Sequence, residues 1–536
     1  MQVFDYVIVG AGSAGCVLAE RLTRDPATSV LVLEAGGPDG ATVLKSPMLM
    51  GFAIQSPRFN WHYETTPQAA LFDRRLYWPR GRTLGGSSAI NAMHYVRGAP
   101  ENYDEWRDAY GCDGWGWEEA LEAFRRVQGQ TRPGMGPLHG YDGPLTVQDI
   151  APLNPLTEAF FRAGDAMQAP RNPDFNGPDQ TGFGPYQVTQ RGLTRWSAAD
   201  AFLKPAMARP NLTVMTGALV RRVLIEGGRA RGVEFEIGGS VLTLDVRREV
   251  LLAGGAINSP QVLMLSGVGD PDDLRAAGVA PEVELPGVGR NLQDHLDVIA
   301  QIETRGADAV SFAPGATLRN LKAALAWALG RPGEMSVNPI QGGAFLKSSR
   351  ASDLPDLQFV FTPALASPHG RELPFAYGAS LHVCVLYPKS RGRIALASAD
   401  PRQAPLIDPA YGSEPEDLEV LTDGLTIARD ILRSEAFAGV RKREVLPRPD
   451  ATGRAALMDD ARARAETLYH PVGTCRMGRG EDAVVDPACK VRGVAGLRVV
   501  DASVMPRLIG GNTNAPTMMI ATRAADMILA EAGAAA

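Results

Sequence analysis

The sequence predicts an α/β fold, α+β overall, in which a Rossmann-like domain is interrupted by an inserted domain built on an antiparallel sheet flanked by helices. Two strand–glycine–helix elements, near residues 4–22 and 249–260, indicate the parallel sheet of the first domain. Between residues 300 and 460 alternating strands replace the glycine turns, which is typical of an antiparallel sheet. At 536 residues the chain is too long for one compact core, so two domains are expected.

The first element carries a G-x-G-x-x-G motif at Gly10, Gly12 and Gly15. The motif follows an apolar run over residues 4–9, and a second apolar run ends at Glu34. We interpret this as a βαβ unit that binds a dinucleotide, because Gly10 permits the tight turn, Gly12 lets a pyrophosphate approach the backbone, and Gly15 lets helix and strand pack closely. Glu34 would accept hydrogen bonds from a ribose diol. This pattern alone fits both NAD and FAD.

The second element spans residues 249–260. Its apolar strand and glycine turn lead to Ser259 and Pro260, which we expect to be the N-cap and the first residue of a helix. Three strands of a meander, over residues 214–223, 231–237 and 241–246, precede it. We expect this element to lie beside the first one in a doubly wound sheet.

Composition excludes several classes of protein. The chain has 45% apolar and 21% charged residues and a net charge of −6 without a basic run, so nucleic acid is not expected as a partner. Its five cysteines are scattered without a C-x-x-C pair, which indicates reduced thiols in a cytoplasmic protein and no metal site. The first strand begins by residue 4, which leaves no room for a signal peptide. The sequence contains no uninterrupted run of about 20 apolar residues, the length that a membrane-spanning helix needs.

One amphipathic helix, over residues 318–329, is the candidate for contact with a membrane surface. Arg319, Lys322 and Arg331 lie on its flank. Such a helix either rests on a bilayer or packs on its own domain, and we favour packing on its own domain. The expected location is therefore the cytoplasm, with peripheral contact at the inner membrane as the alternative.

Three polar segments carry the chemistry. Residues 80–93 place glycines, serines and an asparagine between apolar residues, an arrangement suited to close contact with a flat or charged ligand. Residues 469–478 contain His470. Residues 510–520 lead into a helix whose N-terminus, expected at Pro516, leaves backbone N–H groups free to bind a ligand.

Together these segments resemble the glucose–methanol–choline (GMC) family of FAD-dependent oxidoreductases, and in particular its bacterial alcohol and choline dehydrogenase branch. The match extends from Gly10 through residues 81–93 and 255–269 to both C-terminal segments. It implies that the dinucleotide is FAD. The implied domains are an FAD-binding domain from residues 1–150, 211–298 and 462–536, and a substrate-binding domain from residues 151–210 and 299–461.

The resemblance also assigns residues from all these segments to FAD. They are Gly10, Gly12, Ser13, Ala14, Gly15, Glu34, Ala35, Trp61, Arg82, Thr83, Gly86, Ser87, Asn91, Ala92, Met93, Val220, Ala253, Asp501, Ala502, Asn512, Pro516 and Thr517. Some family members attach FAD covalently through a histidine in the segment after the double glycine. Ile90 stands at that position here, so non-covalent FAD is expected.

By analogy with the family, His470 is the catalytic base and Asn514 is its hydrogen-bond partner on the substrate oxygen. A neutral imidazole can take the hydroxyl proton of a primary alcohol while a hydride passes to flavin N5, which leaves an aldehyde. The helix N-terminus at Pro516 suits the negative charge that develops on the flavin. Among the other histidines, His94 and His295 are secondary candidates. Four are expected to be structural: His62, His139, His369 and His382.

The substrate pocket is expected to be apolar. Ala92 stands where some choline-oxidising relatives have a serine, which weakens choline as a substrate. The side chains expected in the pocket favour a medium- or long-chain primary alcohol, and they are Met48, Met50, Phe52, Phe359 and Phe361. For the stretch from Met48 to Phe52, simple core packing is the alternative interpretation.

Several alternatives remain open at this level. Electrons are expected to pass to a quinone or another acceptor, but an alcohol oxidase that uses O2 and produces H2O2 runs the same first half-reaction. An enzyme similar to the FAD-containing hydroxynitrile lyases, or a flavin-binding protein without catalysis, would belong to another class. Nothing in the sequence sets the oligomeric state.

Overall fold

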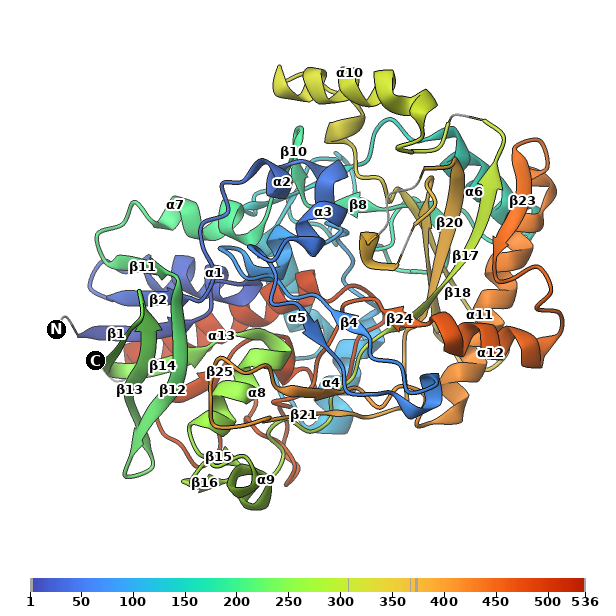
Figure 1. Cartoon of the computed structure of the whole chain (residues 1–536). Helices are drawn as coiled ribbons and strands as arrows, with labels where there is room; N and C mark the ends of the chain where they lie inside the picture. Colours follow the sequence, from blue (N-terminus) through green and yellow to red (C-terminus); the bar gives the residue numbers. More distant parts are fainter. Residues whose placement is uncertain (1–2, 307, 367, 372–374, 535–536) are drawn as a thin grey trace.

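The computed structural model describes residues 3–306, 308–366, 368–371 and 375–534. Two seven-stranded sheets organise the chain, and Figure 1 shows them on opposite sides of the molecule with helices around them. The first sheet holds both strand–glycine–helix elements, and all strand pairs of the second are antiparallel. The predicted fold class is confirmed.

The first sheet combines a parallel part with an antiparallel meander. In spatial order it contains β11 (Leu212–Thr216), β2 (Val30–Glu34), β1 (Phe4–Val9), β14 (Ser240–Leu252), β13 (Arg229–Ile237) and β12 (Ala218–Glu226), and β25 (Leu497–Val499) pairs with β14. We expected separate strands at residues 241–246 and from residue 249. The structure has one strand of 13 residues instead, because its first half pairs with β13 and its second half with β1.

Helix α1 (Ser13–Leu22) follows β1 and packs against α13 (Asn514–Ala534), the last helix of the chain. The turn between β1 and α1 depends on its glycines. Gly10 has a φ of +101°, and a Cβ on Gly15 would lie 1.9 Å from the carbonyl oxygen of Gly10. This close approach fixes the start of α1 directly beyond the end of β1.

Helix α8 (Gly255–Leu265) begins five residues before Pro260, the expected first residue of the helix, so that prediction is wrong. Pro260 lies inside the helix and cannot donate to the carbonyl of Ala256. The hydroxyl of Thr474 donates to that carbonyl at 2.6 Å instead. The helix therefore continues through the proline because a distant side chain satisfies the freed acceptor.

The second sheet is built from the central part of the chain. In spatial order it contains β23 (Arg441–Leu446), β17 (Leu296–Thr304), β20 (Gly378–Val385), β19 (Leu357–Thr362), β18 (Gly342–Leu346) and β7 (Gly182–Pro185), and β24 (Glu466–Thr467) pairs with β17. Helices α6 (Pro155–Ala166) and α11 (Pro415–Arg433) pack against it.

Helix α10 (Thr317–Ala328) forms where the sequence predicted a helix, and one side of it rests on its own domain, where Trp327 Nε1 donates to the carbonyl of Leu193, but its apolar side does not pack there. None of its residues is buried. Leu318, Leu321 and Leu325 are 64%, 63% and 62% exposed. Within the described ranges, no helix combines the length and the apolar character needed to cross a bilayer.

Candidate active site

A large cavity of about 470 Å³ extends from the glycine turn after β1 to strands β19 and β20 of the second sheet. It is lined by His470, Asn514, Met48, Met50, Phe52 and most of the residues assigned to the dinucleotide. Those residues are Gly10, Gly12, Ser13, Ala14, Glu34, Ala35, Trp61, Gly86, Ser87, Asn91, Ala92, Met93, Val220, Ala253, Asp501, Ala502, Asn512 and Thr517. The fold thus brings residues from both ends of the chain into one site.

Four of the assigned residues do not line this cavity. Gly15 is used in the packing of α1 on β1, and Pro516 lies within the first turn of α13. Thr83 is buried, and its hydroxyl donates to the carbonyl of Gly37 at 2.9 Å. Arg82 lines a smaller adjoining cavity of about 410 Å³, where its guanidinium lies 4.8 Å from the ring of Trp61.

The expectation that Phe359 and Phe361 line the substrate pocket is wrong. Both side chains are fully buried, and the ring of Phe361 stacks on Phe160 with the centroids 4.9 Å apart. Side chains of a strand alternate between its two faces, so the cavity receives Val360 and Thr362, which lie on the face opposite to Phe359 and Phe361.

The backbone before His470 is strained and held in place. Tyr469 has a φ of +71°, a conformation that costs a bulky residue about 1–3 kcal/mol. Its N–H donates to Thr467 Oγ1 at 2.8 Å, and its carbonyl accepts from the Arg80 guanidinium at 2.9 Å. The N–H of His470 donates to the carboxylate of Asp294 at 2.7 Å. These bonds fix the direction in which the His470 side chain leaves the backbone.

A chain of hydrogen bonds sets the tautomer of His470. His295 Nε2 lies 3.0 Å from the carbonyl oxygen of Leu386, which can only accept, so Nε2 of a neutral His295 carries the proton. Its Nδ1 is then an acceptor, and it lies 2.9 Å from Nδ1 of His470. His470 therefore donates from Nδ1 and keeps the lone pair on Nε2, the nitrogen that faces Asn512.

Asn514, predicted to act with His470 on the substrate oxygen, lines the cavity but does not contact the His470 ring. Asn514 accepts a hydrogen bond from the Ser13 hydroxyl at 2.7 Å, at the junction of α1 and α13. Asn512 Nδ2 lies 3.2 Å from His470 Nε2 instead. Its other amide atom accepts from Gln358 Nε2 at 3.2 Å, which orients the NH2 group toward His470. Asn512, assigned above to the cofactor, is therefore the asparagine that contacts the His470 ring.

The environment keeps both imidazoles neutral. Burial lowers the pKa of His470 well below its ordinary value, and the nearby His295, Arg80 and His94 lower it further. Burial also lowers the pKa of His295 to about 4. A neutral imidazole with a free lone pair is the form that can accept a proton.

Three further histidines line the cavity. They are His94, a secondary candidate from the sequence, and His369 and His382, which we had expected to be structural. His369 Nδ1 lies 2.8 Å from the Tyr469 hydroxyl, and His382 Nδ1 lies 2.7 Å from the Asp297 carboxylate. No local motif marks these two residues in the sequence. His62 and His139 do not line the cavity.

Comparison with known proteins identifies the family to which this chain belongs. The chain matches the GMC oxidoreductase family over residues 4–297 and 388–521. The chain belongs to the GMC oxidoreductase family. An alcohol dehydrogenase (acceptor) of Pseudomonas putida is 46% identical to this GMC oxidoreductase over 530 residues, which are 98% of this chain and 96% of that protein. The mitochondrial choline dehydrogenase of Mus musculus is 43% identical over 534 residues, covering 98% and 89%.

Among solved structures, pyridoxine 4-oxidase from Mesorbium loti resembles this GMC oxidoreductase with a TM-score of 0.89 at 33% sequence identity, covering 98% of this chain and 99% of that one. A formate oxidase at 24% identity has a TM-score of 0.90, which shows a shared fold. GMC oxidoreductases are FAD-dependent enzymes that act on CH–OH donors.

The residues present fit FAD. The carboxylate of Glu34, only 6% exposed, accepts from the N–H groups of Ala11 and Gly36, both at 2.8 Å, which fixes it at the cavity wall. A Cβ on Gly86 would lie 2.7 Å from the Cα of Gly12, so this approach of two backbone segments around the cavity requires glycine. Ile90 lines the cavity, and its aliphatic side chain has no group that could form a covalent bond to the flavin.

Proposed function

We propose that this GMC oxidoreductase oxidises an apolar primary alcohol to the aldehyde and passes the electrons to a quinone or another acceptor. The observation that carries the proposal is the chain of hydrogen bonds from Leu386 through His295 to His470, which leaves an unprotonated nitrogen beside Asn512 in the cavity. The similar alcohol dehydrogenase (acceptor) of Pseudomonas putida supports the same class of reaction.

In this proposal His470 Nε2 takes the proton of the substrate hydroxyl. Asn512 Nδ2 donates a hydrogen bond to the same oxygen, which stabilises the negative charge that develops there without adding a charge to the site. Bound FAD supplies the hydride acceptor. Because the Nδ1 proton of His470 is held by His295, the ring cannot rotate to expose the wrong nitrogen.

The Asn512 side chain is itself positioned by a second chain of hydrogen bonds. Gln358 Nε2 donates to the Asn512 amide oxygen at 3.2 Å and to the Tyr186 hydroxyl at 2.9 Å. The Tyr186 hydroxyl donates to the carbonyl of Phe359 at 2.9 Å. The donor that we assign to the substrate oxygen therefore has one orientation before substrate arrives, which is the basis of electrostatic preorganisation.

The walls of the cavity support an uncharged substrate. Its apolar part includes Met48, Met50 and Val360. Among the described residues that line it, the carboxylates are Glu34 and Asp501, and hydrogen bonds occupy both. We therefore propose a medium- or long-chain alcohol rather than a cationic one such as choline, because no free carboxylate would pair with a quaternary ammonium group.

The same proposal assigns FAD binding to the domain of the first sheet and substrate binding to the domain of the second. We assign FAD binding to residues 1–150, 211–298 and 462–536, and substrate binding to residues 151–210 and 299–461. The strands support this division, except that β17 begins at Leu296 and β24 joins the second sheet. We further propose that the protein contacts a membrane peripherally, which would bring it to a quinone.

The test is reduction of the bound FAD in the absence of air by primary alcohols of increasing chain length. We expect bleaching of the flavin, fastest with medium or long chains, followed by rapid reoxidation with a quinone analogue. Absence of bleaching with every alcohol would contradict the reaction and leave the lyase alternative. Stoichiometric H2O2 in air, with no response to quinone, would replace the dehydrogenase with an oxidase.

A further inference from the structure

The outer face of α10 carries a row of exposed leucines. Leu318, Leu321, Leu325 and Leu329, which we call the leucine face, are 60–64% exposed. Their spacing of three and four residues places them on one side of the helix. Figure 1 shows α10 projecting at the edge of the molecule, away from both sheets. Single exposed leucines are ordinary on protein surfaces, but a row of four marks a surface that contacts something.

The opposite side of α10 is the side attached to the protein, and it is attached by polar contacts. Trp327 Nε1 donates to the carbonyl of Leu193 at 3.2 Å, and Asn320 Nδ2 donates to the carbonyl of Ser311 at 2.9 Å. An amphipathic helix that served only its own core would have the reverse orientation, with its leucines inward. The arrangement therefore indicates an apolar partner outside the chain.

The leucine face is close to the mouth of the cavity. Phe312, five residues before Thr317, is 37% exposed, and its ring meets that of Phe52 edge to face with the centroids 6.2 Å apart. Both phenylalanines line the cavity, and Phe52 is 42% exposed. Phe312 thus belongs both to the cavity wall and to the segment that leads into α10.

The charged residues beside α10 indicate which kind of apolar partner the leucine face contacts. Arg319, Lys322 and Arg331 lie in and beside α10, and Arg319 is paired with Glu334 at 3.4 Å, which leaves Lys322 and Arg331 as the cations beside the leucine face. Lys322 and Arg331 are exposed. An apolar helix face bordered by cations is the pattern that lies in the headgroup region of an anionic bilayer, because the leucines enter the acyl chains while the cations meet lipid phosphates.

We propose that the leucine face docks on an anionic lipid bilayer, and that the cavity then opens toward the acyl chains at Phe52 and Phe312. Docking does not depend on the proposed reaction. Delivery of an apolar alcohol from the bilayer to the cavity does rest on the proposed oxidation of such an alcohol.

Sedimentation of the FAD-bound protein with vesicles tests the docking. We expect binding to vesicles that contain phosphatidylglycerol, weaker binding to pure phosphatidylcholine, and a loss of at least about tenfold in the double variant Leu321→Glu/Leu325→Glu. The matched control is Leu242→Glu/Leu406→Glu, which places the same charges on leucines that are 40% and 48% exposed outside α10. The control should bind as the wild type does.

A second arm compares dodecanol dissolved in the vesicles with water-soluble butanol. The α10 double variant should lose several-fold in FAD reduction by the first and keep its rate with the second. If neither alcohol reduces the wild-type FAD, the proposed function fails, whereas sedimentation still decides the docking. Two results would overturn the docking: wild-type binding that the α10 variant does not change, or a lipid-free dimer that only the α10 variant dissociates.

Discussion

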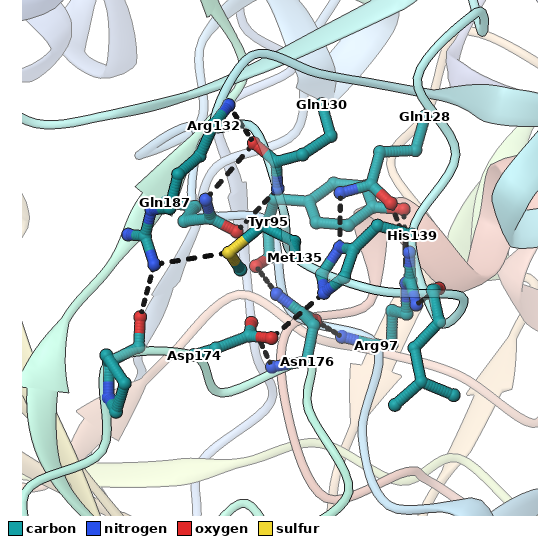
Figure 2. Close-up of polar contacts among 12 residues, drawn as sticks. Tyr95, Arg97, Gln128, Gln130, Arg132, Met135, His139, Asp174, Asn176 and Gln187 are labelled. Atoms are coloured by element: carbon teal, nitrogen blue, oxygen red, sulfur yellow. Dashed lines mark hydrogen bonds and ion pairs between the residues drawn. The ribbon is translucent and has the colours of Figure 1, made fainter.

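Two buried histidines of this protein, His470 and His139, are each held by hydrogen bonds at both ring nitrogens, but only His470 lines the cavity. Figure 2 shows the network around His139, in which Nδ1 lies 3.1 Å from Gln128 Nε2 and Nε2 lies 2.9 Å from the Asp174 carboxylate. Both ring nitrogens are thus occupied by protein. In His470, Nδ1 is held by His295, and Nε2 lies 3.2 Å from Asn512 Nδ2 at the cavity wall.

The partners differ in charge. Burial by itself raises the pKa of Asp174, but the hydrogen bond and charge of His139 keep it below its ordinary value, so a carboxylate remains beside that ring. His470 has another imidazole as its partner, and among the described residues no carboxylate is hydrogen-bonded to its ring. A carboxylate would stabilise an imidazolium, whereas a neutral acceptor keeps the ring uncharged and ready to take a proton. The two rings therefore differ in the charge of their partners and in their access to the cavity.

The largest effect is expected for His470→Ala. Removal of the base should slow FAD reduction by alcohol by about 10²–10⁴-fold. FAD content should stay at the wild-type level, because His470 is not part of the glycine turn between β1 and α1. Stopped-flow absorbance of the flavin without air measures the rate, and unchanged kinetics would mean that another group is the base.

The second largest effect on FAD reduction is expected for Asn512→Ala. Loss of one preorganised donor typically costs about 10²–10³-fold in kcat. The matched control is Asn514→Ala, two residues away, which should weaken the contact with Ser13 and leave the chemical step nearly unchanged. A larger loss in the Asn514 variant would restore the pairing that the sequence suggested.

His295→Leu should have a smaller effect, because it removes the acceptor for the Nδ1 proton of His470 while leaving the base in place. We expect kcat to fall about 10–100-fold with KM little changed, since the wrong tautomer would be populated. His295→Asn can still accept at the position of Nδ1 and should recover most of the rate. If both variants are equally slow, His295 serves packing rather than the tautomer.

The smallest effect on catalysis is expected for His139→Leu, which should not change the rate of FAD reduction. Its cost should appear in stability, about 1–3 kcal/mol, because the buried Gln128 amide and the Asp174 carboxylate lose their partner. Denaturant unfolding of the FAD-bound protein measures this. A kinetic defect at wild-type stability would erase the distinction between the two histidine networks.

Sequence patterns predicted the parts of this site that are local. The glycine turn, Glu34 and His470 each stand in a motif whose chemistry can be interpreted without knowledge of distant contacts. The choice between Asn512 and Asn514 could not be made in that way, because it depends on α13 beginning at Asn514 and turning that side chain toward Ser13. His295 lies 175 residues from His470, and only the tertiary fold brings the rings together.

The error at β19 has a similar origin. An apolar strand of six residues has two faces, and composition does not tell which one meets the cavity and which one meets α6. The packing of Phe361 on Phe160 settles the choice in favour of Val360 and Thr362. For α10 the pattern identified an amphipathic helix correctly, but it could not say whether the apolar face turns inward or outward.

The hydrogen bond between Ser13 and Asn514 joins residues 501 positions apart, and it has a consequence for biosynthesis. The glycine turn is therefore synthesised 501 residues before the wall of the cavity opposite it. During that interval the first βαβ unit lacks the second half of the cofactor site. A complete site for FAD requires that α13 has been synthesised and has packed against α1.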